Sequence, residues 1–301
     1  MTMEMFERQL MQSLQKKAGS SRRVSRQSIV KNNGVRVPAL VVQAAEYRIS
    51  PCIYTRDLYQ LYLRGASVEE LTDSIWRDLQ EDGKEQMDFS FFADFQKVKD
   101  KLFCKVVNRE RNEELLEDSP HEVWEDLAIC FYYEWQQEPA AGSTVHIRKE
   151  HAKLWGVSED EISVAAWENT LREKPARVSP LDQILQEMAG PGAEFPWEEE
   201  LPLYHLSNMD NRQGAVCFLY PAIGEWLDSM VGGSFYVLPS SIHESILLPA
   251  SYQVERKVLQ DMVYSINRQE LDPMEILSDS IYFYDSKEKK MSRLQTEEGG
   301  C

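Results

Sequence analysis

Apolar side chains recur every four residues in two segments of the chain, one near each end. The first stripe comprises Phe6, Leu10 and Leu14, and the second comprises Val254, Val258, Met262 and Ile266. A four-residue spacing places side chains on one face of an α-helix. We therefore expect amphipathic helices over 5–17 and 251–267, each of which buries its stripe in the core.

Two further helices begin with the same local pattern. The segment "GASVEELTDSIW" begins at Gly65, and "GVSEDEISVAAW" begins at Gly156. The matched serine and glutamate pairs are Ser67 with Glu70 and Ser158 with Glu161. Each pair predicts a capping box, in which serine and glutamate each accept the other's backbone N–H. Both copies follow a predicted strand pair and a short helix, which favours a diverged β-β-α-α internal repeat. The alternative is that the two helices are unrelated and share only the common capping-box sequence at their N-termini.

Short apolar runs bounded by Gly, Pro, Asn and Ser predict strands along the whole chain. These runs are 35–43, 48–54, 102–107, 127–136, 143–149, 203–208, 215–221, 235–238 and 245–249. Pro38 has no backbone N–H, so we expect the first run to be an edge strand or to contain a bulge. The strands occur in hairpin-like pairs without regular β-α-β alternation, which is typical of the α+β class. The sequence thus predicts mixed or antiparallel sheets covered by helices.

Changes in composition divide the chain into five expected segments. These are a basic N-terminal helix and arm (1–31), an α+β region with the two similar units (32–188), a connection (189–202), a C-terminal strand and helix segment (203–285) and a polar tail (286–301). The connection "AGPGAEFPWEEELP" is rich in Pro, Gly and Glu. Such a segment cannot continue a helix or a central strand, so we expect a surface loop there.

The net charge of −17 is unevenly distributed. Residues 1–31 carry seven Lys and Arg against two Asp and Glu, so the rest of the chain is strongly acidic. An acidic surface repels nucleic acid and anionic lipid. Only residues 1–31 would attract nucleic acid, and a short basic arm more commonly docks on its own protein or is solvated. We expect no membrane partner and leave the identity of a protein partner open.

The five cysteines include no Cys-x-x-Cys pair, and most have apolar neighbours. This pattern predicts reduced, buried thiols. The longest apolar run, 127–133, is far too short to cross a bilayer. The first ten residues carry charges where a signal peptide would be apolar. We therefore expect a cytoplasmic protein.

The stretch "FYVLPSSIHESILLP" concentrates the residue types of a hydrolase site. Ser240 and Ser241 are candidate nucleophiles, His243 is a candidate base, and Glu244 is a candidate orienting acid. The serines lack the Gly-x-Ser-x-Gly flanks of a nucleophile elbow. A His243 ring within about 3 Å of a serine oxygen, in an open pocket, would favour the enzyme.

The same stretch has a structural interpretation. A strand ends at Pro239, Ser241 and Glu244 form a capping box on one helical turn, and a second strand follows. Such a turn also suits an anion, because hydroxyls and backbone N–H groups meet at a helix start. The candidate binding residues around it are Tyr220, Tyr236 and His205.

No pattern assigns a metal or a cofactor. His146 and His151 are five residues apart, whereas two metal ligands on one helix prefer a spacing of four. The Gly-containing segments "GPG" and "VGG" lack the pattern of a phosphate-binding loop.

Three segments carry a resemblance to a known family. They are "HAKLWGVSEDEISVAAWENT" (151–170), "NMDNRQGAVCFLYP" (208–221) and "GGSFYVLPSSIHESILLP" (232–249). They resemble an uncharacterised bacterial domain-of-unknown-function family found mainly in gut Firmicutes, and the resemblance covers most of the chain. It implies a compact bacterial cytoplasmic protein, but no reaction, cofactor or catalytic residue. Ser234 stands where the family has an acidic residue.

Two functions follow from these observations. The first is a non-enzymatic cytoplasmic interaction or regulatory protein, favoured because no catalytic arrangement stands out. The alternative is a hydrolase or an anion-binding enzyme that uses the turn from Pro239 to Glu244.

Overall fold

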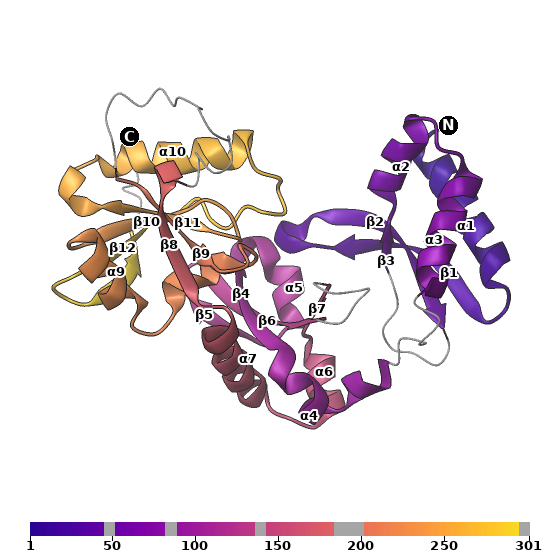
Figure 1. Ribbon diagram of the computed structural model, residues 1–301, viewed down its shortest axis with the longest axis horizontal. Helices are drawn as coiled ribbons and strands as arrows, with labels where there is room; N and C mark the ends of the chain where they lie inside the picture. Colours follow the sequence, from indigo (N-terminus) through magenta and orange to yellow (C-terminus); the bar gives the residue numbers. More distant parts are fainter. Residues whose placement is uncertain (45–51, 82–88, 136–142, 184–201, 295–301) are drawn as a thin grey trace. The chain divides into compact units, whose positions relative to one another are not determined.

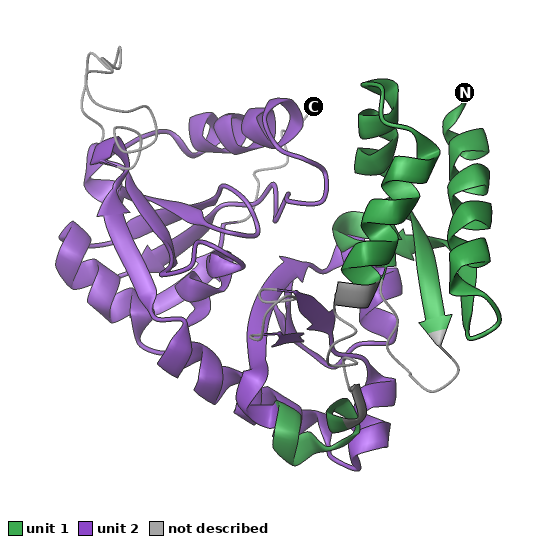
Figure 2. Ribbon diagram, turned by 45° about the vertical axis from the view of Figure 1, so that its right-hand side comes forward, with its two compact units in different colours: residues 1–98, 137–141 green, residues 99–136, 142–301 purple. Residues whose placement is uncertain are grey.

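The computed structural model describes five ranges of the chain, and the contacts within them form two compact units. The ranges are 1–44, 52–81, 89–135, 143–183 and 202–294. Unit 1 contains the described residues up to Val98, and unit 2 contains those from Lys99 onward (Figure 2). The connection expected at 189–202 lies outside the described residues except for Pro202.

Unit 1 is a three-stranded antiparallel sheet with helices packed on it (Figure 1). Its elements are α1 (Met3–Ala18), β1 (Arg22–Val30), η1 (Asn32–Gly34), β2 (Arg36–Ala44), β3 (Cys52–Tyr54), α2 (Thr55–Leu63), α3 (Val68–Glu81), η3 (Phe89–Ala93) and α4 (Phe95–Val98). Phe6, Leu10 and Leu14 of α1 are fully buried, as predicted. They form the core of unit 1 with side chains from α3 and β2.

The basic segment of unit 1 is a strand and not an arm. Residues 22–30 pair along their whole length with β2. Arg26 forms an ion pair with Glu7, with its Nε 2.8 Å from the carboxylate, and Thr55 donates a hydrogen bond to the same carboxylate over 2.6 Å. Glu7 is almost completely buried, so the guanidinium supplies the charge that a buried carboxylate requires.

Strand β2 is the central strand of its sheet, although Pro38 predicted an edge strand or a bulge. Strand β3 pairs only with the three residues from Ala39 to Val41. Pro38 therefore has a strand neighbour on one side alone, which is the position where a missing N–H is tolerated.

Unit 2 contains two antiparallel sheets. The first has the order β4-β6-β5, with β7 also paired to β6, and the second has the order β13-β12-β10-β11-β9-β8. Its strands are β4 (Leu102–Asn108), β5 (His121–Trp124), β6 (Leu127–Glu134), β7 (Thr144–His146), β8 (Ala176–Pro180), β9 (Tyr204–Asn208), β10 (Phe235–Pro239), β11 (Ser245–Pro249), β12 (Tyr282–Asp285) and β13 (Lys290–Arg293). The antiparallel sheets and their helices confirm the predicted α+β class.

The helical elements of unit 2 cover these sheets. They are η4 (Lys99–Lys101), η5 (Glu110–Asn112), α5 (Glu113–Glu117), α6 (Lys149–Trp155), α7 (Glu159–Glu173), η6 (Gly214–Leu219), α9 (Ile223–Val231), η7 (Ala250–Tyr252) and α10 (Arg256–Gln269). Helix α7 packs on β4, and the hydroxyl of Thr170 accepts the backbone N–H of Cys104 over 2.8 Å. Within the described ranges, no helix is both long and apolar enough to cross a membrane.

Both predicted capping boxes are present. The backbone N–H of Ser67 donates to Glu70 over 2.8 Å, and that of Ser158 donates to Glu161 over 2.9 Å. Both helices follow two paired strands and a shorter helix, but α3 packs mainly on α1 whereas α7 packs mainly on β4. The internal repeat therefore stays a prediction.

Two segments of unit 2 differ from the expected strand pattern. Residues 214–219 form the 3-10 helix η6 and not a strand. Five of these six residues are buried, and a short apolar run of this kind carries no periodicity that separates a buried strand from a buried helix. Residues 290–293, expected in the polar tail, form β13 and pair with β12.

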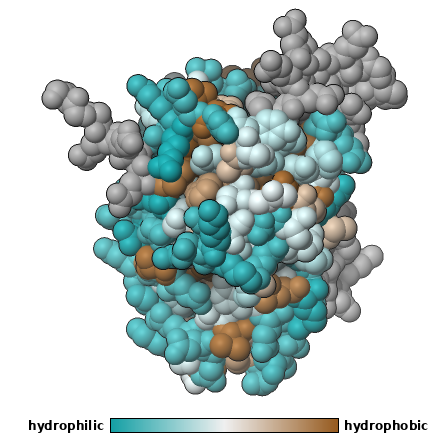
Figure 3. Space-filling model, turned by 90° about the vertical axis from the view of Figure 1, so that its left-hand side faces the viewer, coloured by the Kyte–Doolittle hydropathy of each residue, from teal (hydrophilic) through white to brown (hydrophobic). Residues whose placement is uncertain are grey.

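Helix α10 buries a different stripe from the predicted one. Leu259 and Val263 face the core, whereas Val258 and Met262 are 52% and 37% exposed. Both stripes have the four-residue spacing of a helix, and they are offset by one residue. The sheet below α10 packs against the stripe that contains Leu259 and Val263. Apolar side chains also reach the surface elsewhere, and Figure 3 shows several separate apolar patches on one mainly hydrophilic face.

Leu259→Ala and Val258→Ala form a matched test of this orientation. We expect Leu259→Ala to lower the free energy of unfolding by about 2–4 kcal/mol, because it leaves a cavity beneath α10. Val258→Ala should change it by less than about 0.5 kcal/mol, as is usual for an exposed side chain. Urea unfolding monitored by circular dichroism measures both values. A larger loss of unfolding free energy for Val258→Ala than for Leu259→Ala would place the stripe that contains Val258 in the core.

Candidate functional site

The predicted catalytic stretch is a β-hairpin. Strands β10 and β11 pair from Phe235 with Pro249 to Pro239 with Ser245. The backbone N–H of Ser241 donates to the carbonyl of Glu244 over 3.2 Å and closes the turn. No helical turn forms here, because Ser241 accepts the N–H of His243 at 3.0 Å and the Glu244 carboxylate bonds elsewhere.

The imidazole of His243 does not meet a serine oxygen. Its Nδ1 accepts the backbone N–H of Gln213 over 3.1 Å. This bond places the proton of the neutral ring on Nε2, which lies 3.9 Å from the carboxylate of Glu275. Ser240 turns its hydroxyl to Glu244 over 3.3 Å. The turn therefore does not assemble the serine–histidine pair that a nucleophile requires.

The carboxylate of Glu244 bonds instead to His205. Their side chains meet at 2.7 Å between Oε2 and Nε2, and His205 is buried. The hydrogen bond from His205 lowers the pKa of Glu244 below its ordinary value, although burial acts in the opposite direction. His205, proposed as a binding residue, thus fixes the side of the hairpin turn to strand β9.

The 3-10 helix η6 packs closely against this turn. A Cβ atom on Gly214 would lie 2.2 Å from the Ser207 hydroxyl and 2.6 Å from the carbonyl oxygen of His243. The Ser207 hydroxyl donates to the same carbonyl over 2.8 Å. The polar groups of the turn therefore bind one another and neighbouring strands, which makes the turn a structural junction.

Replacing Glu244 by Gln tests this junction through its pH dependence. Glu244 has a lowered pKa in the folded state, so its contribution to stability is present above the unfolded pKa of about 4.3 and is lost as the pH falls through the folded value. We expect Glu244→Gln to lower the free energy of unfolding at pH 7 by about 1 kcal/mol, a small value because the side chain is partly exposed.

The difference between wild type and Glu244→Gln should shrink when denaturant unfolding is repeated below pH 4. Glu275→Gln is the matched control, because its carboxylate lies beyond hydrogen-bond distance from His243. A Glu244→Gln difference that stays constant down to pH 3 would rule out a lowered pKa.

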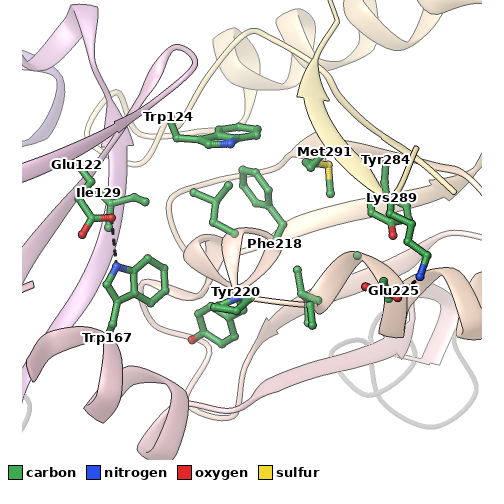
Figure 4. A pocket seen from close by; sticks show the side chains of 15 residues that line it. Glu122, Trp124, Ile129, Trp167, Phe218, Tyr220, Glu225, Tyr284, Lys289 and Met291 are labelled. Atoms are coloured by element: carbon green, nitrogen blue, oxygen red, sulfur yellow. Dashed lines mark hydrogen bonds and ion pairs between the residues drawn. The ribbon is translucent and has the colours of Figure 1, made fainter. Parts of the chain in front are cut away.

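A pocket of about 380 Å³ opens elsewhere in unit 2, between its two sheets. Five of its fifteen lining residues are aromatic, with rings from β5, α7, β12 and the η6 segment (Figure 4). These rings belong to Trp124, Trp167, Phe218, Tyr220 and Tyr284. They are contributed by segments far apart in the sequence, so no local motif marks the pocket.

The aromatic side chains hold one another in place. The ring centroids of Trp124 and Phe218 are 5.7 Å apart in an edge arrangement, and those of Trp167 and Tyr220 are 6.2 Å apart. The hydroxyl of Tyr220 donates to the carbonyl of Lys174 over 2.8 Å. Burial raises the pKa of Tyr220 far above its ordinary value, so this phenol remains neutral.

Glu122 lies at one end of the pocket and accepts two hydrogen bonds from α7. The indole N–H of Trp167 donates to it over 3.3 Å, and the hydroxyl of Ser163 donates to its other oxygen. Glu122 pairs directly with Ile129 in the neighbouring strand, and both line the pocket. The carboxylate is therefore held in one orientation at the pocket wall.

The opposite end of the pocket has balanced charges. The ammonium of Lys289 lies 2.7 Å from the carboxylate of Glu225, and Figure 4 shows both beside Tyr284. The Tyr284 ring packs directly on Gly224, where a Cβ atom would come within 2.1 Å of it. The Tyr284 hydroxyl is buried and has no partner among the described residues.

The carboxylate of Asp126 connects the two sheets behind the pocket. It accepts hydrogen bonds from Ser278 at 2.6 Å, Ser280 at 3.0 Å and Tyr282 at 2.9 Å. Asp126 is buried and follows β5 by two residues, whereas Tyr282 begins β12. These three bonds fix the β5–β6 turn against the second sheet.

Two neighbouring tyrosines provide a matched test of these contacts. Tyr282→Phe removes a hydrogen bond to a buried carboxylate, so we expect it to lower the free energy of unfolding by about 1.5–3 kcal/mol. Tyr284→Phe removes a buried hydroxyl without a partner, so it should leave that value unchanged or raise it by up to about 1 kcal/mol. Urea unfolding at pH 7 measures both. Equal losses would contradict the assigned hydrogen bonds.

The predicted binding residues lie in three places. Tyr220 lines the pocket, and His205 belongs to the hairpin junction. Tyr236 packs on the face of the second sheet below α10, with its ring 5.1 Å from that of Phe283. The structure therefore does not bring the three together.

His146 and His151, near β7, bond to different partners and do not form a joint site. Nε2 of His146 lies 2.6 Å from the hydroxyl of Ser119, a pair that the sequence analysis missed. That hydroxyl is buried and donates to the carbonyl of Leu115, so it is not a free nucleophile. Burial lowers the pKa of His146, and His151 caps α6 through Arg148. Within the described ranges, no cluster of three His, Cys, Asp or Glu side chains could hold a metal ion.

Comparisons with known proteins identify one family. Its model matches residues 3–286 and is described as a family of unknown function, DUF5688. This match confirms the resemblance to an uncharacterised family. No curated protein matches the chain. No solved structure matches it either.

Proposed function

Because the chain belongs to the DUF5688 family of unknown function, its role must be argued from its own residues, and we propose that it is a non-enzymatic binding protein. Its ligand is a small organic molecule that enters the aromatic pocket of unit 2. In this proposal, binding of the ligand is the signal through which the protein acts as a regulatory or interaction protein. The pocket is the observation that carries this proposal.

The pocket shares its volume, its aromatic rings and its fixed polar groups with small-molecule sites, although polar and apolar surface are about equal in it. Such sites are concave, mainly apolar and aromatic, and contain a few fixed polar groups. The volume of about 380 Å³ is within the range of ligand pockets, and Glu122 supplies a polar group held by two hydrogen bonds. The aromatic rings are packed against one another, so the wall is formed before a ligand arrives.

The hairpin turn supports binding rather than hydrolysis. Ser240 donates to Glu244, Glu244 meets His205, and His243 accepts from Gln213. A hydrolase at this turn would have to break several of these bonds to bring His243 to a serine. The pocket needs no such rearrangement.

A bacterial origin and a cytoplasmic location are part of the proposal. The family resemblance supports the bacterial origin, and the buried free thiols support the cytoplasmic location. Cys104, Cys130 and Cys217 are buried free thiols, and burial raises the pKa of Cys130 to about 11. Thiols in this state are neutral and unreactive at pH 7.

A fragment library screened by ligand-observed NMR tests the proposed binding. Ile223 lines the pocket, so Ile223→Trp should fill it. We expect fragments that bind the wild-type protein to lose at least tenfold in affinity for Ile223→Trp, and to be recovered chemically unchanged after long incubation.

Val164→Trp is the matched control, since Val164 is exposed on α7 and does not line the pocket. It should bind the same fragments as the wild type. Circular dichroism checks that both variants are folded. Fragments that bind Ile223→Trp as well as they bind the wild type would place their site elsewhere and overturn the proposal.

A further inference from the structure

Glu122 is an exposed carboxylate at the pocket wall, and no described basic side chain serves as its counter-ion. Its hydrogen bonds come from the indole of Trp167 and the hydroxyl of Ser163, which are both neutral donors. Among the described residues, no Lys, Arg or His forms an ion pair with it. Glu225, the other carboxylate of the pocket, is already paired with Lys289 at 2.7 Å. The free negative charge of the pocket therefore lies at the Glu122 end.

The walls beside this carboxylate favour a cation. Figure 4 shows the Trp167 ring directly below Glu122, with Trp124 and Tyr220 farther along the wall. Aromatic faces attract ammonium groups through their quadrupole, and tryptophan does so most strongly. A carboxylate together with tryptophan and tyrosine rings is the chemistry that recognises alkylammonium groups.

The rest of the pocket favours an apolar stem on that cation. Phe218, Pro221 and Ile223 are among its lining residues. Among the described residues, the pocket brings together no group of three His, Cys, Asp or Glu side chains that could hold a bare metal ion. The net charge of −17 also raises the local concentration of cations around the protein.

We infer that the pocket binds an organic cation, an ammonium group on a short apolar stem, with Glu122 as its counter-ion between aromatic rings. This inference rests on the proposed binding function and specifies the ligand class. Glu122 supplies the charge, Trp167 and Ser163 keep its carboxylate in place, and the aromatic wall covers the methyl or methylene groups of the ligand.

Choline and its neutral isostere 3,3-dimethylbutan-1-ol are the probes for this inference. The two have nearly the same shape and differ in charge, so their affinities separate a cation site from an apolar one. We expect isothermal titration calorimetry to detect choline binding at least tenfold tighter than the isostere. Glu122→Gln should remove this preference by weakening choline at least tenfold.

Glu168→Gln is the matched control for charge, since it makes the same change next to Trp167 at a residue that does not line the pocket. It should leave choline affinity within twofold of the wild type. Trp124→Phe should keep most of the affinity, whereas Trp124→Leu should lose it. Thermal unfolding checks the fold of each variant.

Three outcomes would overturn the inference. They are equal affinities for choline and the isostere, an unchanged affinity in Glu122→Gln, and no choline binding at all. If fragments still bind the wild type and fail with Ile223→Trp, the pocket remains the binding site and only the ligand class is wrong. If no fragment depends on Ile223, the proposed function itself fails.

Discussion

The hydrogen bonds to the buried carboxylate of Asp126 determine how the two sheets of unit 2 meet. Three hydroxyls, from Ser278, Ser280 and Tyr282, converge on one side chain. A buried carboxylate is costly unless such partners are present, so the arrangement that supplies all three is favoured, and the guanidinium of Arg293 lies 3.7 Å from the same carboxylate. Because Trp124 precedes Asp126 by two residues and Tyr282 begins β12, this arrangement also sets the distance across the back of the pocket.

Close backbone approach is the second constraint on the site. Gly214 allows η6 to reach the hairpin turn, and Gly224 allows the start of α9 to lie on the ring of Tyr284. A side chain at either position would move η6 or α9 outward. Phe218 and Tyr220 lie between these glycines, so their place in the pocket wall depends on both contacts.

The sequence predicts a feature well where residue spacing within one helix determines it. It predicts a feature poorly where contacts between distant segments determine which of two similar patterns is buried. The stripe through Leu10 and the capping box at Ser158 were predicted correctly, because each rests on spacing within one helix. Helix α10 carries two stripes of equal spacing, and only the sheet below it selects Leu259 over Val258. The pocket had no local signal, since its wall combines segments from 122 to 291. Tyr220 was proposed as a binding residue, but nothing in the sequence connected it with Trp124.

The contrast between the hairpin turn and the pocket shows why residue types alone do not locate a site. The turn holds Ser, His and Glu side chains, yet Glu244 bonds to His205 and Nδ1 of His243 accepts the backbone N–H of Gln213. A group whose bonds are completed inside the protein stabilises structure and has little left to offer a ligand. Glu122 differs from them: it is exposed at the pocket wall, neutral donors fix its orientation, and no described Lys, Arg or His pairs with its charge. The proposed cation site therefore lies at the pocket, where the sequence has no catalytic pattern.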